Sequence, residues 1–177
     1  GKRFKEKILE VKIKGKNIYD VLDMTIEDSL KFFQNSKTII NKLRPLNDVG
    51  LGYLKLGQSS STLSGGEAQR LKLASYLIQD NKVSKNNSLF IFDEPTSGLH
   101  NMDIENFMKS VNDLIARDNS VIIIEHNTEL IKQADWIIDM GPGGGENGGT
   151  ICFEGEPTEL VNTNNNKTGK YLRKMFV

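Results

Sequence analysis

The chain has 177 residues, of which 37% are hydrophobic and 26% charged, and its formal net charge is zero at pH 7. This composition allows one packed domain with an appendage, and the balanced charge gives no general argument for nucleic-acid binding. The single cysteine, Cys152, excludes an intrachain disulfide and a cysteine-built metal site, and we expect it to be a small buried apolar residue.

No apolar run reaches the roughly 18 residues that a bilayer span needs, so we expect no membrane partner. No signal peptide opens the chain, and we expect a cytoplasmic protein. The first residue is not methionine, which suggests a piece of something longer.

The first residues of the chain are rich in lysine. Residues 1–16 contain seven basic side chains against two acidic ones. The mostly alternating pattern over 7–14 predicts a half-buried strand, followed by a turn at 15–17. A solvated strand with lysines at the sheet edge would explain these charges, and a surface that faces DNA is the alternative.

Two short helices are expected next. Thr25 and Asp28 have the spacing of a helix start. A second helix is expected over 37–43, ending before Pro45, because proline disfavours the helical conformation of the residue before it.

The stretch Leu63 to Arg70 reads Leu-Ser-Gly-Gly-Glu-Ala-Gln-Arg. Two adjacent glycines at a helix N-terminus let an anion approach backbone N–H groups that carry partial positive charge, so this pattern indicates a phosphate site. A simple capping box between Ser64 and Glu67 is the alternative. The helix continues with apolar residues at near-helical spacing, which predicts a core face.

A polar loop is expected over 80–87, and the apolar run over 88–92 predicts a buried parallel strand. It ends in Asp93 and Glu94. Two carboxylates at the carboxyl end of such a strand cost folding free energy, which is offset if they bind a cation or take part in catalysis. A helix-capping pair at the strand exit is the alternative.

Strand and helix alternate in the rest of the chain, with an amphipathic helix at 101–117, a strand at 121–124, a short helix at 128–134 and a strand at 136–139. This order predicts an α/β fold with a mainly parallel sheet flanked by helices. His126 follows the second strand, so neighbouring strands would bring it to the same sheet edge as Asp93. A structural or surface histidine is the alternative.

Gly143, Gly145 and Gly148 match Gly-x-Gly-x-x-Gly, but residues 149–154 have the pattern of a strand. A dinucleotide fingerprint needs a helix there, so we interpret these glycines as a flexible connection. A helix is expected to begin near Pro157, and a terminal helical turn is expected over 171–176.

Leu63 to Glu67, followed by Phe90 to Glu94, resembles the signature motif and the Walker B strand of the ABC ATPase family. The resemblance implies an ABC-type nucleotide-binding half-domain with ATP and Mg²⁺ as cofactors. It implies these roles: nucleotide contacts from Ser64, Gly65, Gly66 and Glu67, a Mg²⁺ contact from Asp93 through water, orientation of the attacking water by Glu94, and a contact of His126 with the terminal phosphate. His100 falls in the family's D-loop, which suggests an interface position.

No Gly-x-x-x-x-Gly-Lys-Ser/Thr loop occurs in the chain. We therefore expect the back half of a nucleotide-binding domain, which alone does not hydrolyse ATP. In ABC ATPases the signature glycines face a nucleotide bound by the opposing domain, so the resemblance implies that Ser64, Gly65 and Gly66 act across an interface.

The runs 21–25, 48–58 and 134–142 resemble the C-terminal part of the UvrA family, ATPase subunits of bacterial nucleotide excision repair. The family implies a dimeric parent that binds damaged DNA without reading sequence and loads UvrB, with Zn²⁺ in the parent only. We expect residues 1–60 to belong to a mostly helical, DNA-facing region with a short N-terminal strand, and residues 61–177 to form the C-terminal half of the second ABC ATPase domain.

Two other classes stay open. A transporter ATPase subunit is disfavoured by Glu67, where transporters usually have Gln, and by the turn Gly98-Leu99-His100, where they usually have Ala-Leu-Asp. A DNA-binding or scaffolding fragment without a catalytic contribution is the other alternative.

Overall fold

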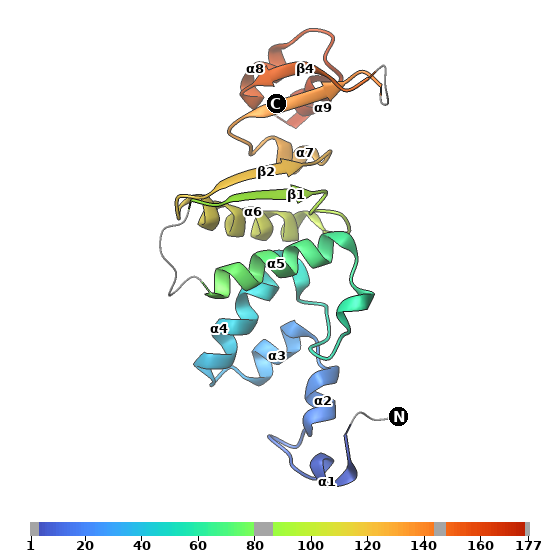
Figure 1. The fold of residues 1–177 in the computed structure, drawn as a ribbon, viewed down its shortest axis with the longest axis vertical. Coiled ribbons are helices and arrows are strands. Elements are labelled where there is room, and N and C mark those ends of the chain that lie inside the picture. Colours follow the sequence, from blue (N-terminus) through green and yellow to red (C-terminus); the bar gives the residue numbers. More distant parts are fainter. Residues whose placement is uncertain (1–3, 80–86, 144–147, 176–177) are drawn as a thin grey trace. The chain divides into compact units, whose positions relative to one another are not determined.

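The computed structural model describes residues 4–79, 87–143 and 148–175, and the chain forms two compact units, Gly1–Ile124 and Glu125–Val177. Each unit contains one two-stranded sheet (Figure 1). The predicted polar loop over 80–87 lies almost entirely outside the described residues, and so does Gly145. The functional division into residues 1–60 and 61–177 stays a prediction.

Short helices make up the first part of unit 1 (Figure 1, blue to cyan), as the sequence predicts for a mostly helical region. They are α1 (Glu6–Leu9), α2 (Ile18–Asp23), α3 (Ile26–Phe32) and α4 (Lys37–Leu46). The predicted strand over 7–14 is wrong, because this segment contains α1 and an isolated bridge between Ile13 and Lys16. Alternation alone does not form a strand when no neighbouring strand supplies hydrogen-bond partners.

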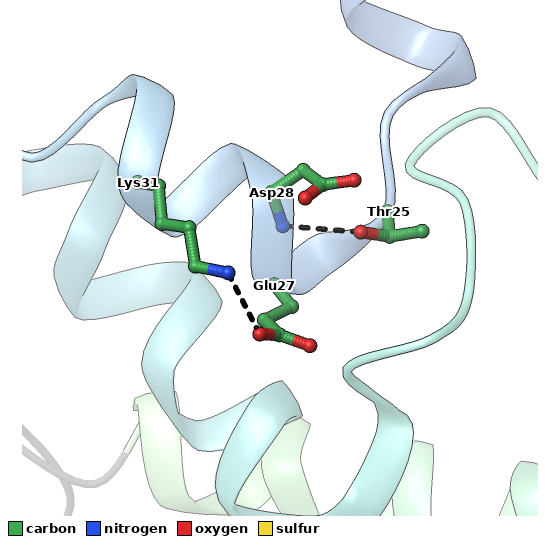
Figure 2. A network of polar contacts seen from close by, with 4 residues as sticks. All are labelled: Thr25, Glu27, Asp28 and Lys31. Carbon is green, nitrogen blue, oxygen red and sulfur yellow. Dashed lines mark hydrogen bonds and ion pairs between the residues drawn. The ribbon is translucent and has the colours of Figure 1, made fainter.

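Helix α3 starts as the sequence predicts. The Thr25 side chain accepts a hydrogen bond from the backbone N–H of Asp28 at 3.0 Å (Figure 2). One turn further, Lys31 and Glu27 form an ion pair at 2.9 Å with both side chains largely exposed. These two contacts join residues no more than four positions apart in the sequence, so they are local.

Helix α4 contains Pro45, so the predicted end before this proline is wrong. The chain continues into a π-type turn, η1 (Asn47–Leu51), in which Val49 and Leu51 are fully buried. Burial of these side chains outweighs the backbone hydrogen bond that the proline cannot donate. Gly50 has φ +77°, and a Cβ there would lie 2.8 Å from the Leu99 side chain, so this turn requires glycine.

The centre of unit 1 is built from α5 (Gly65–Gln79), β1 (Leu89–Asp93), α6 (Asn101–Ile115) and β2 (Ser120–Ile124). β1 and β2 pair in parallel, as predicted. α6 covers one face of the pair (Figure 1). On that face the ring centroids of Phe92 and Phe107 lie 5.9 Å apart in an edge-to-face arrangement. The predicted amphipathic helix is thereby confirmed, and its buried apolar side chains are Ile104, Phe107, Met108, Val111 and Leu114.

The other face of β1 and β2 is largely open in the described part of the chain. Four apolar residues on it are more than half exposed: Leu89, Ile91, Ile122 and Ile124. Among the residues that the structure describes, β1 is therefore buried on one face only.

Unit 2 contains α7 (Thr128–Ile131), β3 (Ile137–Gly141), β4 (Thr150–Gly155), α8 (Pro157–Asn162) and α9 (Lys167–Leu172). Its small core consists of Ile137, Leu160 and Leu172. β3 and β4 pair antiparallel, so the expectation that the strand over 136–139 joins a parallel sheet is wrong. An antiparallel pair needs only a short connection, which the segment between the two strands provides.

β4 stands where a dinucleotide fingerprint would need a helix, which confirms the rejection of that motif. Cys152 on this strand is exposed, so its predicted burial is wrong. The short helical turn η4 (Arg173–Met175) follows α9 as expected. Within the described ranges, no helix has the length and apolar character to cross a membrane.

Candidate functional site

The start of α5 is a capping box. The Glu67 carboxylate accepts a hydrogen bond from the backbone N–H of Ser64 at 2.7 Å, and the Ser64 hydroxyl oxygen accepts one from the Glu67 N–H at 3.3 Å. The capping role that the sequence offered as an alternative is therefore present. It does not exclude a ligand, because Ser64 and Gly65 are exposed and the Ser64 hydroxyl acts as an acceptor in this bond, which leaves its hydrogen for another partner.

The two glycines of this helix start have different surroundings. A Cβ at Gly65 would meet no atom within 4 Å, so the backbone there is open to an approaching group. A Cβ at Gly66 would lie 3.3 Å from Arg70 Nη1 and 3.4 Å from the Glu94 carbonyl oxygen. Gly65 leaves room for a ligand, whereas Gly66 allows the helix to approach the chain that follows β1.

Glu67 is also bonded to a residue from the preceding segment, since the Tyr53 hydroxyl donates a hydrogen bond to its carboxylate. This bond, with the Ser64 backbone N–H, holds the pKa of Glu67 below its ordinary value. Burial raises the pKa of Tyr53, and the bond to Glu67 adds to that rise. The Glu67 carboxylate therefore faces protein donors, and its predicted contact with nucleotide stays a prediction.

Two further side chains of α5 bind the end of β1. Gln69 accepts a hydrogen bond from the Asp93 backbone N–H at 3.0 Å. Arg70 is only 1% exposed, and its Nη1 donates to the Pro95 carbonyl at 2.5 Å and to the Ser97 carbonyl at 3.4 Å. Burial lowers the pKa of Arg70, and nearby Tyr53 and Glu67 oppose that effect.

No role was predicted from the sequence for Tyr53, Gln69 or Arg70. A signal for Arg70 existed, because it lies one turn before the buried residues Leu73 and Ala74 of α5. A charged residue in line with an apolar stripe is expected to be buried and held by specific partners. Tyr53 had no comparable signal, since its partner lies 14 positions away in the sequence.

Asp93 and Glu94 lie at the carboxyl end of β1, where the sequence placed them. Both are exposed, and the next two residues, Pro95 and Thr96, are buried. The Glu94 backbone N–H donates to the Ile124 carbonyl at 2.9 Å, which extends the parallel pairing by one bond. Glu94 has φ +47°, a left-handed conformation that costs a residue with a side chain about 1 kcal/mol or more and that is frequent at functional sites.

The structure therefore brings the start of α5 and the acid pair together within unit 1, through the short distance from Gly66 to the Glu94 backbone. Carboxylate oxygens are the ligands that Mg²⁺ prefers, and an exposed helix start with a glycine suits a phosphate group. The residues present fit a magnesium nucleotide in their donor chemistry.

His126 belongs to unit 2. It is exposed, and its backbone N–H donates to the Glu125 carboxylate at 3.0 Å. The next residue, Asn127, caps α7 through its side chain. The approach of His126 to Asp93 and Glu94 stays a prediction. His100 is exposed at the start of α6, and its interface role is likewise a prediction.

No family model matches the chain. Curated relatives named UvrABC system protein A do match: that of Mycoplasmopsis pulmonis is 50% identical over 176 residues, and that of Clostridium perfringens is 53% identical over 174 residues. These matches cover 99% and 98% of this chain, but the chain spans only 18% of the length of either relative.

Two solved structures are similar. The crystal structure of UvrA2 from Deinococcus radiodurans has a TM-score of 0.81 at 40% identity, with 98% of this chain and 21% of that chain covered. A bacterial Atm1-family ABC exporter with ATP bound has a TM-score of 0.51 at 17% identity, with 94% of this chain and 32% of that chain covered. The exporter shows a likeness of fold alone.

Proposed function

Because this chain belongs to the UvrA family as a segment of it, we propose that it forms the C-terminal half of the second ABC-type ATPase domain of a UvrA protein. The parent would use ATP binding and hydrolysis in nucleotide excision repair. One observation carries the proposal. An exposed helix start with Ser64 and Gly65 lies beside the backbone that carries Glu94, so phosphate-binding and water-activating groups share one unit.

ATP and Mg²⁺, when bound, supply the phosphoryl group and a cation that neutralises its charge. Asp93 would hold the cation through a water molecule. Glu94 would accept a hydrogen bond from the attacking water and take up its proton. His126 would contact the terminal phosphate and so orient it toward that water.

Ser64 and Gly65 would donate hydrogen bonds to a nucleotide held by the phosphate loop of an opposing domain. Their exposure supports this role, because a group that acts across an interface has to be accessible from outside. This chain contains no phosphate loop of its own, so we expect it to hydrolyse no ATP when alone.

The test combines this chain with a separately produced front half that carries the phosphate loop. We expect the mixture to associate when ATP is added and to hydrolyse it. Glu94→Gln should lower turnover about 10²- to 10⁴-fold with nucleotide binding retained. Glu105→Gln, an exposed glutamate on α6, is the matched control and should leave turnover within about twofold.

Full turnover in the Glu94→Gln variant would contradict the catalytic role. Stoichiometric ATPase activity of this chain alone would contradict its assignment as a half-domain. Nucleotide-dependent association of the wild-type halves without any turnover would favour the scaffold alternative.

The basic segment at the start of the chain supports a DNA-facing surface in the parent. Lys12 and Lys16 are exposed, whereas Lys14 donates to the Phe32 carbonyl at 2.9 Å and lies 5.4 Å from the Phe32 ring centroid. Lys14 therefore also holds α3, and its removal would mix a structural effect with a binding effect. Lys12→Ala with Lys16→Ala is the cleaner test.

In the parent, we expect this double variant to reduce the slope of log affinity for DNA against log salt by about 0.9 for each phosphate group that the protein no longer neutralises. The double variant Lys167→Ala with Lys170→Ala, which changes two exposed lysines on α9 outside residues 1–60, is the matched control and should leave the slope unchanged. An unchanged slope in the double variant would remove these residues from the DNA surface.

The remaining partners are proposed for the parent as a whole: damaged DNA without sequence preference, UvrB, a second copy of the parent and Zn²⁺ in a module outside this chain. A cytoplasmic location accords with these partners. A complex of purified parent and UvrB that forms only with ATP, measured by size-exclusion chromatography, tests the loading role.

A further inference from the structure

Arg70 is the most deeply buried charged side chain among the described residues, and its position is informative. Arginine is rarely buried without specific partners, because removal of its charge from water is costly. Its Nη1 atom donates to the carbonyls of Pro95 and Ser97, which belong to the turn that begins at Glu94. The guanidinium thus binds the backbone immediately after the proposed catalytic glutamate.

Two backbone hydrogen bonds lie within the same turn. The Ser97 N–H donates to the Glu94 carbonyl at 3.2 Å, and the Leu99 N–H donates to the Thr96 carbonyl at 2.9 Å. These bonds close the turn on itself but do not attach it to α5. Arg70 attaches it, with Gly66 allowing the close approach.

A second set of contacts holds the start of the same helix. Tyr53 donates to Glu67, and Glu67 accepts the Ser64 backbone N–H. Arg70 lies three residues after Glu67 on α5. Ser64, Glu67 and Tyr53 therefore form a polar network at the helix start, and Arg70 connects that helix to the turn.

This network explains the acid at position 67. Its carboxylate accepts from two donors, the Ser64 N–H and the Tyr53 O–H, through different oxygens. A glutamine has one acceptor oxygen, so one of the two bonds would have to be broken or reversed in direction.

We infer that Arg70 is a positioning residue that fixes the turn carrying Glu94 relative to Ser64 at the start of the same helix, where Tyr53 and Glu67 hold Ser64 in place. A nucleotide engaged at Ser64 would thereby be coupled to the placement of the Glu94 carboxylate. The inference rests on the proposed function for its consequence in catalysis, but its structural content can be measured without any activity.

The first experiment uses this chain and measures amide hydrogen exchange at Ser97 and Leu99. Arg70→Lys keeps the charge but ends the side chain one atom earlier, so its nitrogen no longer reaches both carbonyls that Arg70 Nη1 contacts. We expect exchange at both amides to accelerate about tenfold, which corresponds to removal of a charged hydrogen bond. The amide of Val111, in the core of α6, reports global unfolding, and its acceleration measures the loss of overall stability that accompanies the substitution.

Arg173→Lys is the matched control, because Arg173 also donates to two carbonyls, those of Val161 and Thr163, but in unit 2. It should leave exchange at Ser97 and Leu99 unchanged. Unchanged exchange at these amides in Arg70→Lys would overturn the inference. A larger acceleration at Val111 than at Ser97 and Leu99 would also overturn it, since the main effect would then lie outside the turn.

The second experiment measures steady-state ATPase of the chain assembled with its front half. Arg70→Lys and Tyr53→Phe should each lower kcat about tenfold, with the KM for ATP within about twofold of wild type, because the group that they position acts in the chemical step. Tyr171→Phe, which changes an exposed tyrosine on α9, controls for Tyr53→Phe.

An unchanged kcat in both variants, or a change in KM alone, would overturn the catalytic consequence. If the wild-type assembly hydrolyses no ATP, the proposed function fails, while the exchange measurement still decides whether Arg70 positions the turn.

Discussion

Helices α3 and α5 begin with the same sequence signal and end up in different roles. Thr25 and Ser64 each precede a helix, and an acid follows three residues later in both, Asp28 and Glu67. In both, the hydroxyl oxygen accepts the N–H of that acid, at 3.0 Å in α3 and 3.3 Å in α5. Local sequence therefore specifies a helix start equally well at both places.

The difference lies in what the next turn contacts. The residue six positions after Thr25 is Lys31, 70% exposed in its side chain and paired with Glu27 on the same helix (Figure 2). The residue six positions after Ser64 is Arg70, 1% exposed and bound to carbonyls 25 and 27 positions away. A capping signal thus becomes a candidate site only where long-range contacts surround it.

The largest expected difference in stability between the two helices is for substitution of Arg70 and Lys31. Arg70→Met should lower the free energy of unfolding of this chain by about 1.5 to 3 kcal/mol, because buried carbonyls lose charged hydrogen bonds. Lys31→Met should change it by about 0.5 kcal/mol or less, since an exposed helical ion pair contributes little. Urea unfolding followed by circular dichroism measures both. Equal effects would show that the buried bonds of Arg70 stabilise the fold no more than an exposed ion pair does.

The second-largest difference in stability is expected for the two acids, Glu67 in α5 and Asp28 in α3. Glu67→Gln is expected to cost about 1 kcal/mol at neutral pH, because one of two hydrogen bonds to the carboxylate is removed. Asp28→Asn should cost less, since the bond at that position uses the backbone N–H of residue 28.

The effect of Glu67→Gln should also depend on pH. The folded protein lowers the pKa of Glu67 below its ordinary value of 4.5, so its contribution to stability is present above that pH and is lost as pH falls through the folded value. We expect the difference in unfolding free energy between wild type and variant to shrink as pH is lowered below about 4.5. A difference that stays constant would show that the carboxylate charge does not matter.

Substitution of the two capping residues, Ser64 and Thr25, should give the smallest difference in stability but a clear difference in ATP turnover. Ser64→Ala and Thr25→Ala should each cost about 0.5 to 1 kcal/mol, because each removes one side-chain acceptor from a helix start. In the assembly with the front half, we expect only Ser64→Ala to reduce ATP turnover. Matching decreases of turnover in the two variants would indicate a shared effect on folding and would remove Ser64 from the nucleotide contacts.

Much of the fold was predictable from periodicity. The helices that start at Thr25 and Ser64, the amphipathic α6 and the parallel strand that ends at Asp93 were predicted because their apolar spacing is regular. The strand predicted over 7–14 was wrong: the pattern of Ile8, Val11 and Ile13 alternates only in part, and these residues are exposed and pair with no strand among the described residues. The helix end predicted at Pro45 failed because buried Val49 and Leu51 hold the continuing chain.

The covering of β1 was predicted only in part. The run Leu89 to Phe92 is apolar on both faces, which predicts burial on both, but among the described residues only the face with Phe92 is covered. An apolar run shows that a face can be buried, but it does not show which element covers it.

The sequence by itself determined the family and the positions of Ser64, Gly65, Asp93 and Glu94 at a helix start and a strand end, because those features depend on residues within a few positions of one another. Only the tertiary structure decided that Gly66 serves close packing, that Glu67 is held by Tyr53 and that Arg70 binds the turn after Glu94. These contacts join residues 14 to 28 positions apart, and residues at that separation meet only after the chain has folded.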